Sequence, residues 1–405
     1  MKILSASSLV CISLFFSCSQ TPATSNFITN NIKSNELQQT NQIKNIEKSG
    51  LLLHPRSLDK NEAIRYAKKD EWTSGFYAGI LWYTYDLSKK DKWKKIAEKH
   101  TVDLDSIKHL TWHHDVGFII GSSFLNGYRI AKIPSYKDVV IEAARSLSTR
   151  FRPAAGVIQS WDADKGWQAK RHWKCPVIID TMMNLELLFE ATTLSGDSTF
   201  YNIAKSHAEK TLQNHYRTDN SSYHVVDYNP QTGDIRSRVN AQGYSDESAW
   251  ARGQAWGIYG YTVCYRYTHD KRFLEQAMKI QQYIFNNPQL PEDLVPYWDY
   301  NAPNIPNAPR DASAASCAAS ALYELSTYQP NKGYKKLADK IMTNLASPTY
   351  RTELDTNGNF LLKHSVGSIP HHAEIDVPIV YADYFFLEGL IRKRNLENNK
   401  PVLSY

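Results

Sequence analysis

Cysteine is scarce in this chain, and its few positions exclude two common kinds of site. Only five of the 405 residues are cysteine, and the three that lie beyond the N-terminal segment are Cys175, Cys264 and Cys317. They show no CxxC spacing and no cluster with histidine, so they predict neither a disulfide framework nor a zinc site. Each stands in apolar, helix-like surroundings, where cysteine packs as a small hydrophobic residue. We expect no metal and no cofactor.

Neither positive nor negative charge is concentrated in one part of the sequence. Lysine and arginine number 47 against 41 aspartate and glutamate residues, which gives a formal net charge of +6. Proteins that bind nucleic acids gather basic residues into patches or runs, so we expect no nucleic-acid partner. A mildly positive field nevertheless favours an anionic ligand.

A long apolar run is also missing, and the longest candidate lies at the N-terminus. A lysine follows the initiator methionine, an apolar stretch runs from Leu9 to Phe16, and a serine precedes Cys18. This pattern predicts a lipoprotein signal peptide over residues 1–17, too short to span a bilayer, with Cys18 as the lipidation site. We therefore expect an exported bacterial lipoprotein, held on the membrane by its lipid in the periplasm or at the cell surface. The alternative is an ordinary signal peptide in which Cys18 is incidental.

Large apolar side chains are sparse in the next segment. From Ser19 to about Lys48 the chain is rich in asparagine, glutamine, threonine and serine, a composition that cannot build a core. We predict a flexible tether over residues 18–50, followed by one folded domain over residues 51–397.

Two kinds of helical segment alternate within that domain. Six are apolar nearly all round, which is typical of helices buried on most sides; they begin at Ser74, Asp115, Asp180, Ser248, Asp311 and Asp376. The others carry charge on one face and apolar residues at three- and four-residue steps, as outer helices do; they begin at Lys92, Tyr136, Thr199, Lys271 and Tyr334, with a sixth expected from Leu58.

This alternation predicts an all-α fold, a six-hairpin (α/α)6 barrel or toroid with an inner and an outer ring of helices. The insertions precede the inner helices, at one end of the scaffold, where loops commonly assemble a site. A short β-hairpin is expected over residues 223–239, because β-branched alternation flanks an Asn-Pro-Gln-Thr-Gly turn. Little other strand is expected.

Two aspartates stand where inner helices begin. Asp115 lies in WHHDVGF and Asp180 in IIDTMMN. A carboxyl group at the mouth of a buried bundle is a candidate for proton chemistry, because desolvation or a neighbouring carboxylate can hold it protonated near neutral pH. The alternative is that each aspartate merely caps its helix, as aspartates commonly do.

The segments before the inner helices also carry aromatic and hydrogen-bonding side chains. The candidates for ligand binding are Trp72, His114, Trp161, His224, Gln242, Arg252 and Trp256. Flat aromatic faces suit the C–H faces of pyranose rings, while glutamine, histidine and arginine suit hydroxyls and carboxylates. This composition indicates a sugar-binding crevice, although the tryptophans are equally suited to a core.

At these residues the chain resembles the unsaturated glucuronyl hydrolases of glycoside hydrolase family 88. The resemblance covers residues 72–392 and depends on WTSGFYAG, HHDVGF, IIDTMMNL, WARGQAWGIYG, DASAAS and YADYFFLE in that order. It implies an (α/α)6 barrel and a metal-free reaction on the oligosaccharides that polysaccharide lyases leave. Such an enzyme hydrates the C4=C5 double bond of the terminal unsaturated uronic acid, and the residue leaves as a keto acid.

The resemblance also assigns roles to residues. Asp180 becomes the proton donor and base, and Asp115 its partner, which raises its proton affinity and holds substrate or water. Two such carboxyls titrate as a coupled pair. Arg252 and His224 become candidates for the substrate carboxylate or its hydroxyls, with a structural ion pair and a solvent-facing hairpin position as the alternatives. Gln242 is expected in the first subsite, and the three candidate tryptophans are expected to stack on sugar.

The sugar beyond the scissile bond is left open by a departure from the family pattern. Members that accept sulfated substrates carry Ser-x-x-Ser-x-Lys in a late loop. Here Ser365 and Ser368 are present, but Pro370 stands in place of the lysine, and Lys363 is a nearby substitute. The substrate is therefore expected to be an acidic oligosaccharide of the ulvan type, with sulfated rhamnose, or of the glycosaminoglycan type.

Three other functions are compatible with the same residues. An unsaturated rhamnogalacturonyl hydrolase shares the fold and the hydration chemistry. An inverting glycosidase on the same toroid places two carboxylates about the glycosidic bond with room for water. A lipoprotein could also capture oligosaccharides without turning them over.

Overall fold

The computed structural model describes residues 25–405. The predicted signal peptide and Cys18 lie outside the described residues. Among residues 25–405, no helix has both the length and the apolar character needed to cross a bilayer.

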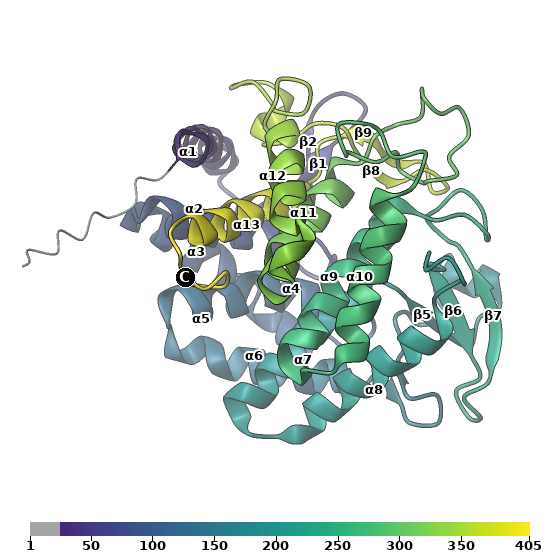
Figure 1. Ribbon diagram of the computed structural model, residues 1–405. Helices are drawn as coiled ribbons and strands as arrows, with labels where there is room; N and C mark the ends of the chain where they lie inside the picture. Colours follow the sequence, from purple (N-terminus) through teal and green to yellow (C-terminus); the bar gives the residue numbers. More distant parts are fainter. Residues whose placement is uncertain (1–24) are drawn as a thin grey trace, which may run out of the picture.

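Six helical segments form a closed inner ring. The contacts run from α2 to α4, α7, α9, α11 and α13, and α13 returns to α2, beside which it lies in Figure 1. The ring consists of α2 (Ser74–Ser88), α4 (Val116–Ile120) with its continuation through η2 (Gly121–Leu125) and α5 (Asn126–Ala131), α7 (Thr181–Ser195), α9 (Ala251–Thr268), α11 (Ala312–Tyr328) and α13 (Val380–Glu397). The predicted inner helices and the (α/α)6 barrel are confirmed.

Six outer helices cover this ring. They are α1 (Asn26–Lys48), α3 (Asp91–Val102), α6 (Pro134–Ser148), α8 (Ser198–Asn214), α10 (Lys271–Phe285) and α12 (Tyr334–Leu345). Five match the predicted amphipathic segments. The sixth was wrongly placed, because the stretch from Leu58 continues a β-hairpin and the sixth outer helix is α1.

Helix α1 overturns the predicted tether over most of its length. Its buried face is largely polar, so it lacks the apolar stripe by which outer helices are recognised, and amide hydrogen bonds attach part of that face to the barrel instead. Gln38 donates to the carbonyls of Thr352 and Phe360, at 3.3 and 3.0 Å, and Asn35 donates to Thr84 Oγ1 at 2.9 Å. The folded domain therefore begins at about residue 26 rather than 51.

All of the strands lie in connections that lead from an outer helix to the next inner helix. They are β1 (His54–Leu58), β2 (Ile64–Ala67), β3 (Phe151–Arg152), β4 (Val157–Ile158), β5 (Cys175–Ile178), β6 (Val225–Tyr228), β7 (Ile235–Val239), β8 (Ser365–Ser368) and β9 (Ala373–Val377). The predicted hairpin is β6–β7, to which β5 adds a third antiparallel strand. Short 3-10 turns complete the connections: η1 (Asp105–His109), η3 (Gln168–Arg171), η4 (Pro330–Lys332) and η5 (Asn357–Asn359).

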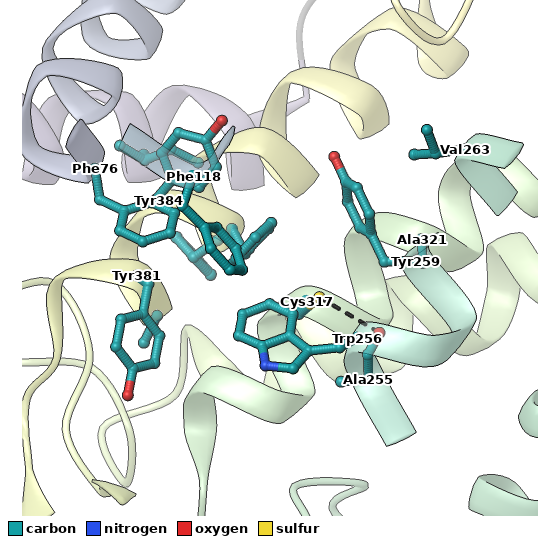
Figure 2. Packing of buried hydrophobic residues seen from close by; sticks show 14 of the residues in the cluster. Phe76, Phe118, Ala255, Trp256, Tyr259, Val263, Cys317, Ala321, Tyr381 and Tyr384 are labelled. Atoms are coloured by element: carbon teal, nitrogen blue, oxygen red, sulfur yellow. Dashed lines mark hydrogen bonds between the residues drawn. The ribbon is translucent and has the colours of Figure 1, made fainter. Parts of the chain in front are cut away.

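The interior of the ring is filled with aromatic side chains. Figure 2 shows Phe76, Phe118, Trp256, Tyr381 and Tyr384 packed among the inner helices. Neighbouring rings meet edge-on or tilted, with centroids about 5 to 6.5 Å apart, the arrangement that aromatic quadrupoles favour. These aromatic side chains thus form the core of the barrel, and a small cavity of about 40 Å³ remains among Phe118, Tyr384 and Glu388.

The cysteines belong to this packing. Cys175, Cys264 and Cys317 are buried and unpaired, as predicted for cysteines acting as small hydrophobic residues, although Cys175 lies on β5 rather than on a helix. Val402 also joins the core, so the domain continues past the predicted boundary at residue 397.

The buried amide of Gln38 provides a test of α1. Gln38→Ala leaves two buried carbonyls without their donor, so the free energy of unfolding should fall by about 1 to 3 kcal/mol. Chemical denaturation measures the change, and Asn30→Ala, at an exposed position of the same helix, is the control. Equal stability of the two variants would mean that α1 does not pack as described.

Candidate active site

Asp115 and Asp180 occupy the N-cap positions of α4 and α7, but neither side chain caps its helix. Asp311, at the same position of α11, does accept a hydrogen bond from the amide of Ser313. The capping alternative therefore holds for Asp311 and fails for the other two. Both aspartates are buried, so the orientation of their carboxyls away from the helix needs another explanation.

Two histidines hold Asp115. Nδ1 of His113 lies 3.2 Å from Oδ2, and Nε2 of His114 lies 3.2 Å from Oδ1. Burial disfavours the charged carboxylate, but the two histidines outweigh burial and keep the pKa of Asp115 below its usual range. Asp115 is therefore ionised at neutral pH.

The tautomer of His114 follows from its partners. The amide nitrogen of Asn184 can only donate, and it lies 3.2 Å from His114 Nδ1, while Thr181 Oγ1 lies 2.8 Å away. Nδ1 thus accepts, and Nε2 carries the proton that faces Asp115. Burial lowers the pKa of His114 below its usual value.

Ser160 extends this network. Its hydroxyl lies 2.8 Å from Thr181 Oγ1 and accepts from the amide of Ile178. Because Thr181 directly follows Asp180, the chain of hydrogen bonds through His114 links the surroundings of both aspartates.

Asp180 faces His224. Oδ2 of Asp180 has no hydrogen-bond partner in the protein and lies 3.5 Å from Nε2 of His224. The amide of Ala241 donates to Nδ1 of the same imidazole, so a neutral His224 carries its proton on Nε2, toward the carboxyl. His224 is buried, and the solvent-facing alternative is wrong.

Gln242 follows Ala241 in the chain and presents an unpartnered atom. Its side-chain oxygen Oε1 is buried and has no hydrogen-bond partner in the protein. Buried polar atoms without partners are rare in folded proteins. Asp180 Oδ2 and His224 Nε2 lie 3.5 Å apart, and together with Gln242 Oε1 they offer hydrogen-bonding capacity to a hydroxyl-rich ligand.

Arg252 is engaged elsewhere. Its guanidinium donates to Asp311 Oδ2 at 3.0 Å, to the carbonyl of Gly367 at 2.6 Å and to the carbonyl of Val366. Only Nε lacks a partner. This geometry favours the structural ion pair over the substrate role, since Arg252 holds strand β8 against α9 and α11.

A cavity of about 330 Å³ opens beside Asp115. Trp72 and Trp161 line it, together with Glu71 and His113. Both tryptophans are only partly buried, so they retain surface that a sugar ring can contact.

Trp256 does not line this cavity. It has no exposed surface and lies among the aromatic rings of the core, against Phe118 and Phe385 (Figure 2). The stacking predicted for Trp256 is therefore not possible in this arrangement, because neither face of its ring is accessible.

The late serines lie on β8. Ser368 Oγ is 2.7 Å from Nδ1 of His371, whereas Ser365 Oγ is buried without a partner. Lys363 donates to the carbonyl of Pro348, so its ammonium is committed elsewhere and does not replace the missing lysine.

Some residues of the site were not predicted. Thr181 directly follows Asp180, and that adjacency was a usable signal. Ser160 and the contact between Trp167 and His371, with centroids 4.8 Å apart, depend on connections that meet only in the folded barrel. No pattern in the sequence could have paired them.

Comparison with known proteins identifies the family. Residues 48–385 match the profile of Glycosyl Hydrolase Family 88. The chain belongs to this family. It is therefore a glycoside hydrolase, and the predicted family and enzyme class are confirmed.

Similar sequences cover most of the chain. An unsaturated glucuronyl hydrolase of Formosa agariphila is 45% identical over 346 residues, which are 84% of this chain and 85% of the relative. An unsaturated chondroitin disaccharide hydrolase of Streptococcus pneumoniae is 35% identical over 329 residues, 80% of this chain and 81% of the relative.

Solved structures agree. An unsaturated glucuronyl hydrolase specific for heparin superposes with a TM-score of 0.86 at 40% identity, covering 94% of this chain and 100% of the other. A substituted unsaturated glucuronyl hydrolase of a streptococcus, complexed with dGlcA-GalNAc6S, superposes with a TM-score of 0.73 at 29% identity, covering 93% of each chain.

The clamp on Asp115 predicts a pH-dependent contribution of His113. Burial opposes the imidazolium, but its bond with Asp115 outweighs burial and raises the pKa of His113 above 6.5. A raised pKa stabilises the fold below the unfolded-state value, and that stabilisation is lost as the pH rises through the folded-state value. The loss of unfolding free energy in His113→Gln should therefore be larger at about pH 5.5 than at about pH 9.

Denaturation at the two pH values measures this difference. His172→Gln, at an exposed histidine for which residues 25–405 provide no ion pair, serves as the control. A larger loss at the higher pH would contradict the charged pairing of His113 with Asp115.

Proposed function

We propose that this enzyme hydrates the C4=C5 double bond of a 4,5-unsaturated uronic acid at the non-reducing end of glycosaminoglycan-type oligosaccharides. The observation that carries the proposal is the pair of buried N-cap aspartates that do not cap their helices. One is clamped as a carboxylate by two histidines, and the other presents an unpartnered oxygen. Such asymmetry suits one charged group and one group that transfers a proton.

In the proposed reaction Asp180 begins as the neutral acid and gives its proton to C4. The double bond then becomes a C4–H bond, and positive charge is shared by C5 and the ring oxygen. Water adds to C5 and returns a proton to Asp180, so the acid is regenerated. The resulting hemiketal opens by breaking the bond from C5 to the ring oxygen. C5 becomes a ketone, C1 becomes an aldehyde, and the neighbouring sugar leaves with its hydroxyl.

The surrounding residues have distinct parts in this scheme. The negative charge of Asp115 stabilises the positive charge that develops on the sugar ring. His224 orients Asp180 through its Nε2 proton, and Gln242 Oε1 accepts from a sugar hydroxyl. Trp72 and Trp161 contact the pyranose faces along the cavity.

The substrate class is supported by the proteins to which the chain is similar. A relative is named for chondroitin disaccharide and a structural neighbour for heparin, and another neighbour holds an unsaturated glucuronyl residue on a sulfated hexosamine. No similar protein reported above is named for ulvan. Turnover on lyase digests of chondroitin, heparin, ulvan and pectin, followed by loss of the ultraviolet absorbance of the double bond, tests the assignment. Activity confined to the ulvan or pectin digest would contradict it.

Asp180→Asn tests the proton donor. The amide cannot deliver the proton, so kcat should fall by about a hundredfold or more while the unsaturated disaccharide still binds. Absorbance decay gives kcat, and calorimetry gives binding. Asp164→Asn, at an exposed position, is the control and should retain normal turnover.

Isotope labelling separates hydration from direct glycoside cleavage. In deuterated solvent the wild-type enzyme should place one deuterium at C4 of the released keto acid, which mass spectrometry detects. Release of the neighbouring sugar without deuterium at C4, or near-normal turnover in Asp180→Asn, would exclude the mechanism.

We also propose that the mature chain is an exported lipoprotein attached through Cys18. The support is the sequence alone: the apolar stretch to Phe16 and the serine before the cysteine. Because α1 begins at Asn26, only residues 19–25 separate the lipid from the barrel. Seven residues span at most about 25 Å, so the lipid would hold the enzyme close to the membrane.

Cys18→Ser tests this attachment. The variant should move from the membrane fraction to the soluble exported fraction and lose incorporation of a labelled fatty acid. Cys11→Ser, within the predicted signal peptide, is the control and should leave both unchanged. Unaltered membrane association and labelling of Cys18→Ser would contradict the proposal.

A further inference from the structure

A continuous line of aromatic rings leads outward from the catalytic carboxyl. His224 faces Asp180, and its ring meets Trp161 edge-on with centroids 6.1 Å apart. Trp161 in turn contacts Trp167 at 5.1 Å and Trp173 at 6.1 Å. Trp161 and Trp167 are only partly buried and form an aromatic wall that begins beside His224, whereas Trp173 is buried.

The far end of the wall joins the β8–β9 hairpin. The ring of Trp167 lies 4.8 Å from that of His371, whose Nδ1 is 2.7 Å from the hydroxyl of Ser368. Strand β8 is fixed in place by Arg252, which binds the carbonyls of Val366 and Gly367. The wall therefore connects two loops that are both anchored to the barrel.

Arg171 lies at this outer end. Its guanidinium carbon is 6.0 Å from the ring centroid of Trp167 and 5.8 Å from that of Trp173. The side chain of Arg171 is exposed to solvent. Within residues 25–405 it makes no ion pair and no hydrogen bond. Arginine held against aromatic faces keeps its donor edge available, and that edge matches the oxygens of sulfate and carboxylate groups.

The positive charge of Arg171 acts on His371, in the turn of the β8–β9 hairpin. Burial and the charge of Arg171 together lower the pKa of His371, so this imidazole is neutral. A neutral His371 whose Nδ1 accepts from Ser368 carries its proton on Nε2. The guanidinium of Arg171 and the Nε2–H of His371 thus flank the end of the aromatic wall. The carboxylate of Asp162 is already paired with Arg150 and Lys165.

We infer that Arg171 binds a sulfate ester on the sugar that follows the unsaturated residue, at the end of the wall formed by Trp161 and Trp167. The inference rests on the proposed function, because it places the leaving sugar along this wall. Arg171, on η3, supplies the positive charge that binds the sulfate. Lys363 instead donates to the carbonyl of Pro348, and Pro370 carries no charge. The enzyme should accordingly prefer a sulfated over an unsulfated leaving sugar.

Matched disaccharides test the inference. Unsaturated chondroitin disaccharides without sulfate, with 6-sulfate and with 4-sulfate all carry the same uronic carboxylate, so the ratio of kcat/KM between them isolates the sulfate. In Arg171→Gln the preference for the favoured sulfated disaccharide should fall by about tenfold, equivalent to about 1.4 kcal/mol. Lys170→Gln removes a charge from the same turn and should change the ratio by less than about twofold.

Added salt gives a second measurement. The wild-type preference should weaken as the salt concentration rises, since the contact is partly exposed, whereas Arg171→Gln should show little dependence. An equal loss for sulfated and unsulfated disaccharides in Arg171→Gln, or an unchanged ratio, would overturn the inference. So would an equal effect of Lys170→Gln.

Binding separates this test from the proposed function. Calorimetry of the three disaccharides with Asp180→Asn, and with the same variant carrying Arg171→Gln, measures sulfate recognition without turnover. If the wild type hydrates none of the disaccharides, the proposed function fails. An Arg171-dependent preference in binding would still support the sulfate contact, and its absence would refute it.

Discussion

The close approach of neighbouring inner helices is the constraint on which the rest of the structure depends. A Cβ at Gly117 would lie 2.4 Å from Oδ1 of Asn184, and one at Gly260 would lie 2.5 Å from Cβ of Met182. These glycines bring α4 against α7 and α7 against α9. Because Asp115 and Asp180 stand at the starts of α4 and α7, the same contacts bring their side chains to one end of the barrel. The spacing of the site is thus set by helix packing.

The polar side chains at the two ends of the ring differ in the partners that they have. Toward the C-terminal ends of the inner helices, arginines and glutamates are paired with one another: Arg129 with Glu186 and Glu190, Arg266 with Glu324, and Arg392 with Glu324 and Glu388. At the N-terminal ends, Asp180, His224 and Gln242 each keep an atom without a partner. The ion pairs hold the inner helices together at one end, and the unpartnered atoms beside the two aspartates leave capacity for a ligand at the other.

The sequence predicted the helical plan well because burial of an inner helix leaves a local signal. Helices α2, α7 and α11 begin at or beside the predicted residues, since their apolar character is visible without knowing their neighbours. Helix α1 was missed for the opposite reason. Its buried face carries Asn35 and Gln38, and their hydrogen bonds go to residues as distant as Phe360. A helix stabilised by long-range amide contacts has the composition of a linker.

The candidate site divides in the same way. The amino-acid sequence by itself determined the family, the six inner helices and the two aspartates at their starts, because these depend on motifs and on residues next to one another in the chain. Only the tertiary structure decided that Asp311 caps its helix while Asp180 does not, that Arg252 binds strand β8, and that Trp256 is core. The reason is that the role of a polar or aromatic side chain is set by the partners it meets, and in a closed ring those partners come from distant segments.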